Sequence, residues 1–267
     1  MKTVLTIAGS DSIGGAGIQA DIKTISALDC YAMSAVTALT AQNTVGVDGV
    51  LEISGDFVKA QMKSVFSDVF PDAVKIGMMG NESIVKAVSE VLADYKAVNV
   101  VTDPVMVSTS GRPLLSEAGK NVLIKQLFPL CDLITPNIPE AEAITGIKIT
   151  SRKDMENAAE VLFDMCRGSV LLKGGHMSGS AADLLFDGDM FTWFESERIK
   201  SSNTHGTGCT LSSAVAVFLA HGLSLKQSVS KAKKYILGAI SHGLDLGHGN
   251  GPLNHFYKNK KGVINEL

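Results

Sequence analysis

Short apolar segments alternate with amphipathic helical stretches along most of the chain. Between the apolar segments, hydrophobic residues recur three and four positions apart, as at Ile84, Val88 and Val91, which is the spacing of one helical face. Such alternation implies crossover connections, a mainly parallel sheet and helices on both faces. We therefore predict a three-layer α/β fold, with strands at 3–8, 33–39, 73–76, 98–102, 133–135 and 170–172.

Local patterns refine this prediction. Ser151 and Asp154 have the spacing of a capping box, which opens a helix. The segment 182–194 is predicted to form a hairpin around Asp187-Gly188, a strong turn signal. A helix over 117–128, a helix that follows its N-cap at Asn81, and two helices that close the chain complete the expected elements.

Composition limits the kind of protein this can be. The chain has 267 residues, 45% apolar and 19% charged, and no linker or repeat, so we expect one globular domain over 1–267. A net charge of -3 argues against a nucleic-acid partner or a membrane surface. The longest apolar run, 214–220, is far shorter than the roughly 18 residues of a membrane helix.

The cysteines give no sign of a metal site or a disulfide framework. Cys30, Cys131, Cys166 and Cys209 contain no Cys-x-x-Cys pair, and the histidines complete no zinc spacing. Reduced thiols in the cytoplasm are the plain interpretation.

Polar or glycine-containing segments follow five of the predicted strands. They begin at Gly9, Gly77, Asp103, Asn137 and Lys173. Ligands of parallel α/β sheets bind beyond the carboxyl ends of the strands, so these segments predict a binding site there.

The glycines of residues 14–17 resemble a dinucleotide fingerprint only weakly. Five residues separate them from the strand end, and no acidic residue follows the next strand to bind a ribose. The chain also lacks a P-loop pattern.

Asp21 lies three residues after Ile18, on the apolar face of the first helix. An unpaired carboxylate there would be costly. Asp21 is expected either to bind a ligand or to accept a hydrogen bond from nearby backbone.

The segment 205–209 opens the clearest amphipathic helix predicted in the chain. Gly206, Thr207 and Gly208 would let backbone N–H groups converge at the positive end of the helix, an anion hole suited to a phosphoryl group. Cys209 lies in the first turn, where the helix dipole is expected to lower the pKa of its thiol. The alternative is a tight turn followed by a small buried cysteine.

Asn137 and Glu140 offer oxygen ligands that suit Mg²⁺ bound through water, although both are also good helix-capping residues. Lys173 could neutralise phosphate charge or be a solvated strand end. Together with the anion hole, these residues indicate phosphoryl transfer.

The sequence resembles the hydroxymethylpyrimidine/phosphomethylpyrimidine kinases of thiamine synthesis, which belong to the ribokinase-like superfamily. The resemblance runs from Thr3 to about Tyr257. It is carried by segments 8–11 (AGSD), 14–24 (GGAGIQADIKT), 40–44 (TAQNT), 75–78 (KIGM), 103–106 (DPVM), 135–141 (TPNIPEA), 173–176 (KGGH) and 204–210 (THGTGCT).

The resemblance implies two ATP-dependent phosphorylations, of 4-amino-5-hydroxymethyl-2-methylpyrimidine and then of its monophosphate. It implies that Gln42 reads the aminopyrimidine edge in a pocket lined by Gly9, Asp21, Met78 and Val105. Asp103, Asn137 and Glu140 would organise Mg²⁺ and phosphates, with Thr207 and Lys173 at the phosphates. Cys209, beside Gly206 and Gly208, takes the place of the aspartate base of sugar kinases. Relatives are commonly homodimers, so a homodimer is expected.

Three alternatives remain. A pyridoxal kinase uses the same scaffold, and Gln42 argues for the pyrimidine because it offers both a donor and an acceptor. A cysteine hydrolase would need Cys209 and His205 to meet across a Gly-Thr-Gly turn. A non-catalytic receptor would leave the anion hole and metal residues without a role. Residues 178–180 and 247–251 are candidate lids.

Overall fold

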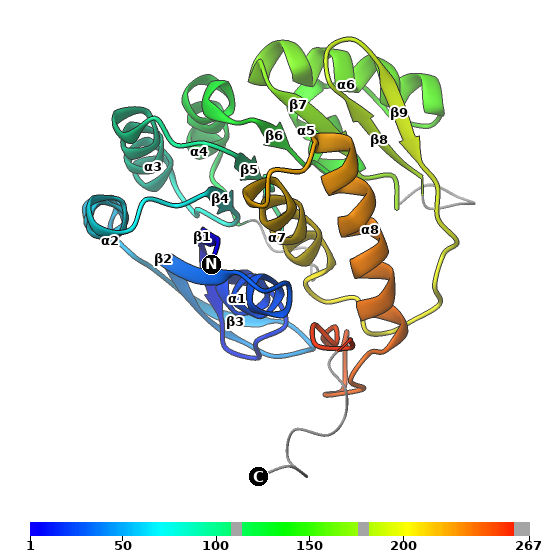
Figure 1. Cartoon of the computed structure of the whole chain (residues 1–267), viewed down its shortest axis with the longest axis horizontal. Coiled ribbons are helices and arrows are strands. Elements are labelled where there is room, and N and C mark those ends of the chain that lie inside the picture. Colours follow the sequence, from blue (N-terminus) through cyan, green and yellow to red (C-terminus); the bar gives the residue numbers. More distant parts are fainter. Residues whose placement is uncertain (108–113, 176–181, 259–267) are drawn as a thin grey trace.

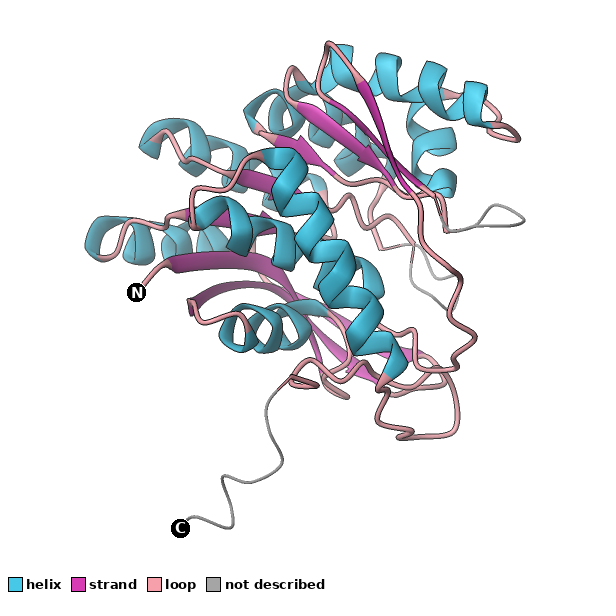
Figure 2. Ribbon diagram, turned by 45° about the vertical axis from the view of Figure 1, so that its right-hand side comes forward, coloured by secondary structure: helices cyan, strands magenta, loops and turns pink. Residues whose placement is uncertain are grey.

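The computed structural model describes residues 1–107, 114–175 and 182–258, and these form one nine-stranded sheet with helices on both faces (Figures 1 and 2). The strand order is β3-β2-β1-β4-β5-β6-β7-β8-β9. The strands are β1 Thr3–Asp11, β2 Tyr31–Gln42, β3 Val47–Glu52, β4 Ala73–Ile76, β5 Val100–Thr102, β6 Leu133–Ile134, β7 Ser169–Leu172, β8 Asp183–Phe186 and β9 Phe191–Phe194.

The six central strands, from β2 to β7, are parallel, whereas β3, β8 and β9 pair antiparallel at the two edges. The mainly parallel sheet and the hairpin of β8 and β9 are therefore confirmed. Gly188, in the turn of that hairpin, has a φ of 99°. The short exposed edge strand β3 has no counterpart among the predicted strands, because half of its residues face solvent and give no apolar run.

The two faces of the sheet build two hydrophobic clusters. Alternate residues of one strand point to opposite faces, so Leu5 joins one cluster and Val4 the other. Helices α2 Gly55–Asp68, α3 Glu82–Tyr95, α4 Glu117–Val122, α5 Ile138–Thr145 and α6 Arg152–Cys166 cover the first face. Helices α1 Gly17–Ala27, α7 Thr207–Ala220 and α8 Leu225–Ser241 cover the second.

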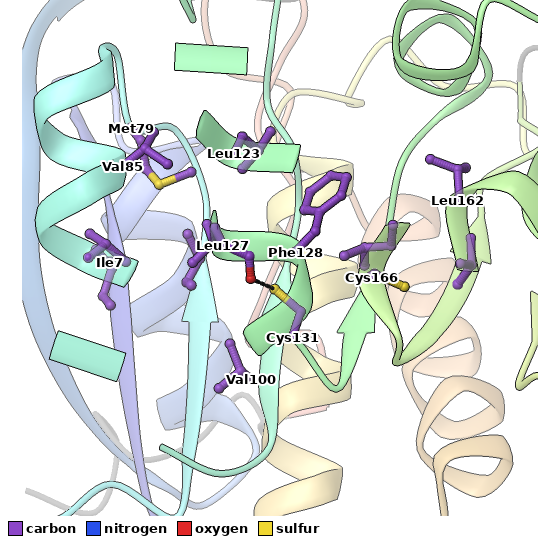
Figure 3. Packing of buried hydrophobic residues seen from close by; sticks show 14 of the residues in the cluster. Ile7, Met79, Val85, Val100, Leu123, Leu127, Phe128, Cys131, Leu162 and Cys166 are labelled. Carbon is purple, nitrogen blue, oxygen red and sulfur yellow. Dashed lines mark hydrogen bonds between the residues drawn. The ribbon is translucent and has the colours of Figure 1, made fainter. Parts of the chain in front are cut away.

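The predicted helix over 117–128 is only partly α-helical. It continues from α4 as a π-helix over Leu123–Leu127 and a 3-10 turn over Phe128–Leu130. Pro129 explains the end of the helix, because it has no backbone N–H to donate. The irregular turns still bury Leu127 and Phe128 in the first cluster, where the Cys131 thiol donates to the Leu127 carbonyl (Figure 3).

Helix starts follow the sequence signals. Asn81 caps α3 by accepting from the Ile84 N–H, and Ser151 and Asp154 form the expected capping box at α6. None of the helices in the described residues is both long and apolar enough to cross a membrane.

A buried ion pair joins the sheet to α1 beneath α7. The Lys75 ammonium on β4 lies 2.8 Å from an Asp21 carboxylate oxygen, and both side chains are fully buried. Asp21 also accepts hydrogen bonds from Thr6 on β1 and Ser213 on α7. Burial alone would lower the pKa of Lys75, but the Asp21 carboxylate outweighs burial and raises that pKa. Four elements thus meet at one charged pair.

Replacing Asp21 by Asn should lower the free energy of unfolding by about 3–5 kcal/mol, because Lys75 would keep a buried charge without its counter-ion. Chemical denaturation measures this loss. The solvent-exposed pair of Lys86 and Glu82 is the control, because water screens it. Lys86→Met should change stability far less than Asp21→Asn, and equal losses would contradict the importance of the buried pair.

Candidate active site

A cavity of about 930 Å³ lies beyond the carboxyl ends of the central strands. The segments that follow β1, β4, β5, β6 and β7 all contribute to its wall, as the pattern of strand ends predicted. Of the residues singled out in the sequence, its lining includes Gly9, Gln42, Met78, Asp103, Val105, Asn137, Glu140, Lys173, Gly206, Thr207, Gly208 and Cys209.

The first turn of α7 forms one wall of the cavity. Gly206 is its N-cap, with a φ of 81°, and a Cβ at this position would collide with the Gly15 carbonyl. The N–H and hydroxyl of Thr207 both donate to the Thr204 carbonyl. In the described part of the chain, no acceptor lies at the N–H groups of Gly208 and Cys209. These two groups are therefore the donors that the helix start can offer to an anion.

An ion pair lies directly against this turn. The Lys173 ammonium is 2.6 Å from an Asp103 carboxylate oxygen, and both side chains are largely buried. A Cβ on Gly208 would lie 2.9 Å from Asp103 Oδ2 and 3.3 Å from Lys173 Nζ, so the backbone of α7 touches both charged groups. Burial alone would lower the pKa of Lys173, but Asp103 and Glu140 outweigh burial and raise it. Lys173 therefore keeps its positive charge beside the helix start.

Glu140 combines the two roles that the sequence offered for it. It forms a reciprocal capping box with Asn137 at the start of α5, and it also lines the cavity. Burial raises the pKa of Glu140 to about 7, and the Asp103 carboxylate adds to this effect. Lys173 and the backbone N–H groups of Asn137 and Met106 lower that pKa in part. The carboxyl group therefore titrates near neutral pH.

A family model for phosphomethylpyrimidine kinase matches residues 11–254. The chain belongs to this family. A hydroxymethylpyrimidine/phosphomethylpyrimidine kinase of Haemophilus influenzae is 45% identical over 262 residues, with 96% of this chain and 97% of that protein covered. A thiamine biosynthesis bifunctional protein of Geobacter sulfurreducens is 49% identical over 254 residues, which are 95% of this chain but only 52% of that longer protein.

Solved structures agree. A phosphomethylpyrimidine kinase from Clostridium difficile is 46% identical, with a TM-score of 0.81, and covers 90% of this chain and 100% of its own. A Staphylococcus aureus pyridoxal kinase in complex with AMP-PCP and pyridoxal is 36% identical, with a TM-score of 0.89, covering 98% of this chain and 96% of its own. The fold is ribokinase-like, and this chain is a kinase, a phosphotransferase that uses ATP.

In this member of the phosphomethylpyrimidine kinase family, the pKa of the Cys209 thiol differs from the sequence prediction. Burial, together with the Asp21 and Asp103 carboxylates, raises the pKa of this thiol to about 11. Lys75 and a hydrogen bond from Gly17 lower the pKa, but they do not compensate. The prediction that the pKa of this thiol is lowered is therefore wrong, because burial and the two carboxylates outweigh the groups that favour the thiolate.

Asp21 does not lie on the wall of the kinase cavity. Its fully buried carboxylate pairs with Lys75 and accepts hydrogen bonds from the hydroxyls of Thr6 and Ser213, and not from nearby backbone. It does not face the cavity. The sequence could place Asp21 on a buried face, but not choose its partners.

The structure also adds cavity residues that the sequence did not single out. Asp11 and His205 line the cavity and lie 2.8 Å apart from carboxylate oxygen to Nε2, although both stood within the recognised motifs. Leu237 and Ile240 of α8 also line it, but their three-residue spacing marks only a helical stripe. Residues 197–201, between β9 and α7, carry no sequence signal at all.

Two alternatives can be compared with this geometry. In the described residues, the His205 ring bonds to Asp11 and Gln42, and no hydrogen bond joins it to Cys209 as a cysteine hydrolase would need. Of the candidate lids, 178–180 lies outside the described residues, as does His176 of the family motif. The segment 247–251 is tied to Thr44 through hydrogen bonds from the N–H groups of His248, Gly249 and Asn250.

The raised pKa of Glu140 predicts that the free energy of unfolding depends on pH. Between about pH 4.5 and 7 the unfolded chain releases the Glu140 proton while the folded chain keeps it, so stability falls as pH rises across this window. Glu140→Gln keeps an acceptor for the capping box and removes the titration. Measured without Mg²⁺ or nucleotide, its free energy of unfolding relative to wild type should be higher at pH 8 than at pH 5.

The control for this prediction is Glu142→Gln, two residues further on. A hydrogen bond from the backbone N–H of Ile149 lowers the pKa of Glu142. The stabilisation by the ionised Glu142 carboxylate is therefore lost only as the pH falls below about 4.5. Between pH 6 and 8 the difference between Glu142→Gln and wild type should stay constant. A difference for Glu140→Gln that is equally flat would show that Glu140 is ionised in the folded chain.

Proposed function

We propose that this kinase phosphorylates the hydroxymethyl group of 4-amino-5-hydroxymethyl-2-methylpyrimidine, and then the resulting monophosphate to the diphosphate. The observation that carries this proposal is the presence, in one cavity, of the Gln42 carboxamide and of a helix start flanked by Lys173. One group can read an aminopyrimidine, and the other can hold a phosphoryl group in transit. The names of the relatives support the same substrate.

We assign the substrate end of the cavity to Gln42, Gly9, Met78 and Val105. The Gln42 carboxamide has a donor and an acceptor, as the amino group and ring nitrogen of the substrate require. Met78 and Val105 are apolar surfaces on which a flat ring can pack. Asp21 does not share this role, because the cavity does not reach it.

We assign the phosphate end to the start of α7 and the neighbouring ion pair. In phosphoryl transfer, negative charge spreads over the three equatorial oxygens of the transferred group. The N–H groups of Gly208 and Cys209 and the Lys173 ammonium are fixed donors that need no reorganisation to meet that charge. Asp103 holds Lys173 in place, and Thr207 and Asn137 complete this wall.

The residues fit a Mg²⁺ ion that arrives with ATP better than a resident metal. Within the described ranges, no cluster of three or more His, Cys, Asp or Glu side chains could hold an ion by itself. The Asp103 carboxylate nevertheless lies close enough to Glu140 to raise its pKa, and Asn137 adds an amide oxygen. Mg²⁺ keeps several waters when it binds with a nucleotide, so these few oxygens would be enough to hold it and neutralise phosphate charge.

We propose that Cys209 positions the hydroxymethyl group rather than acting as a preformed thiolate. During transfer, the substrate oxygen bonds to the γ-phosphorus, the bond from that phosphorus to ADP breaks, and the hydroxyl proton passes to an oxygen of the transferred phosphoryl group. A thiol with a pKa of about 11 is protonated at neutral pH and is therefore not available as the base. The thiol can still hold the hydroxyl in line with ATP.

Pyridoxal phosphorylation is the second candidate. It is favoured by the structural match to the Staphylococcus aureus pyridoxal kinase in complex with AMP-PCP and pyridoxal. The Gln42 carboxamide argues for the aminopyrimidine as the better substrate.

The organisation of the protein is also a proposal. The continuous nine-stranded sheet supports a single kinase domain over 1–267. The four free cysteines suit a cytoplasmic enzyme. A homodimer stays a prediction that rests on the resemblance.

The role of Cys209 can be tested with two substitutions. If the thiol positions the hydroxyl group, Cys209→Ser should keep kcat within about tenfold of wild type, whereas Cys209→Ala should lower kcat by roughly 10²-fold or more. Steady-state kinetics at saturating ATP measures both. If a thiolate is the base, the serine variant should be as inactive as the alanine variant, since a serine hydroxyl does not ionise at neutral pH.

The substrate assignment is tested by Mg²⁺-dependent ATP consumption with the aminopyrimidine and with pyridoxal. Wild type should prefer the aminopyrimidine. Gln42→Met should reduce kcat/KM for the aminopyrimidine by about 10²-fold, because the amino group loses its partner, and affect pyridoxal much less. Equal losses for both substrates would place Gln42 outside the recognition contacts, and no activity with the aminopyrimidine would overturn the proposed function.

A further inference from the structure

The side chains of Asp11, His205 and Gln42 meet at one corner of the cavity. The function proposed above uses Gln42 but neither Asp11 nor His205. His205 Nε2 lies 2.8 Å from Asp11 Oδ2 and 3.3 Å from the Gln42 amide nitrogen. Asp11 and Thr40 are direct neighbours across β1 and β2, so the sheet register itself brings this corner together. His205 arrives from the segment that leads into α7.

The Asp11 carboxylate determines which nitrogen of His205 carries a proton. Burial alone would raise the pKa of Asp11, but its bonds with His205 and with the N–H groups of Ala16 and Ile13 outweigh burial and lower it. An ionised carboxylate only accepts hydrogen bonds, so at 2.8 Å the Nε2 atom of His205 must be the donor. His205 Nε2 therefore has no lone pair to offer to Gln42.

The position of His205 is fixed from several sides. The ring is buried, and a Cβ on Gly15 would collide with it. Its backbone N–H donates to the Gly251 carbonyl at 3.1 Å. The imidazole therefore presents one Nε2–H to the cavity corner and cannot turn to present another atom.

This donor decides which way the Gln42 amide should face. As placed, the amide nitrogen meets the His205 donor, while the Thr40 hydroxyl points its single hydrogen at both the Ser10 carbonyl and the Gln42 amide oxygen, each at 3.0 Å. Turning the amide by 180° puts an acceptor at the His205 donor and a donor at Thr40. The Gln42 oxygen then shares the Nε2–H of His205 with Asp11 in a three-centre hydrogen bond, in which Asp11 is the nearer acceptor. The Gln42 nitrogen donates to Thr40, and Thr40 donates to Ser10.

We propose that His205, oriented by Asp11, is a positioning residue that fixes the Gln42 amide with its oxygen toward the imidazole, and that this orientation selects the aminopyrimidine edge. This inference rests on the proposed function. One lone pair and one hydrogen remain on the outer edge of the Gln42 amide, in a fixed order. A 4-aminopyrimidine offers the complementary donor and acceptor, and its hydroxymethyl group must face α7, so it presents them in one order only.

The main chain of Gln42 is also held in place, by Ser12. Its N–H donates to Ser12 Oγ at 2.8 Å, and its carbonyl accepts from the same hydroxyl at 2.7 Å. The main chain therefore holds Gln42 at this corner, and the side-chain contacts with Thr40 and His205 hold its amide.

The test compares two variants of similar shape, His205→Gln and His205→Met. Glutamine keeps an N–H donor near Asp11 and methionine does not. The measured quantity is the ratio of kcat/KM for the aminopyrimidine to that for 5-hydroxymethyl-2-methylpyrimidine, which lacks the amino group. Wild type should give a ratio of about 100 or more. His205→Gln should keep most of it, and His205→Met should lower it at least about tenfold, mainly through KM for the aminopyrimidine.

Two controls separate positioning from damage to the anion hole, which lies next to His205. Loss of the anion hole would lower kcat for both substrates equally and leave the ratio unchanged. In a Gln42→Met background, His205→Met should have no further effect on the ratio, because the amide that it orients is gone. Calorimetric titration of the aminopyrimidine without ATP should show the same order of affinities, wild type and His205→Gln above His205→Met.

Three results would overturn the inference: an unchanged ratio in His205→Met, an equal loss in both His205 variants, or additive effects of the His205 and Gln42 substitutions. A wild-type enzyme that uses pyridoxal but neither pyrimidine would instead overturn the proposed function, and the inference with it. Melting curves of each variant confirm that it is folded before the comparison is made.

Discussion

The approach of the α7 N-terminus to the carboxyl ends of the central strands is the constraint on which the active site depends. Gly206 and Gly208 make it possible, because a side chain at either position would strike the Gly15 carbonyl or the Asp103 carboxylate. This close contact places two N–H donors beside the Lys173 ammonium. The same turn carries His205 and Cys209, so the phosphate end and the substrate end of the cavity share one short segment.

The buried charges around this segment differ in what they do. The Lys75–Asp21 pair lies below the cavity, joins β4 to α1, and is fully shielded from water. The Lys173–Asp103 pair lies on the wall, where the cation can reach a ligand. Burial of a pair is costly unless every charge is matched, so both pairs constrain how the strands and α7 fit together. Only the second is placed to act on phosphate.

Burial also changes the acid–base groups of the site. It raises the pKa of the Cys209 thiol to about 11 and of Glu140 to about 7. A base that is ionised before the substrate binds is therefore not available at Cys209. The fixed donors of α7 and Lys173 remain as the main source of stabilisation for the charge that moves between ATP and the hydroxyl group.

The sequence by itself determined the layered α/β fold, most strand positions, and the residues at the strand ends, because hydrophobic periodicity and capping are local properties. It also pointed to the α7 start, where the Gly-Thr-Gly segment gained weight beside the residues at the strand ends. Only the tertiary structure decided that Asp21 pairs with Lys75 rather than facing the cavity, that burial and nearby carboxylates raise the pKa of Cys209, and that Asp11 orients His205 against Gln42. These outcomes depend on contacts between residues far apart in the sequence: Lys75 and Asp21 are separated by 54 positions, His205 and Asp11 by 194, and His205 and Gln42 by 163. They also depend on the loss of water around these residues, which no local sequence pattern records.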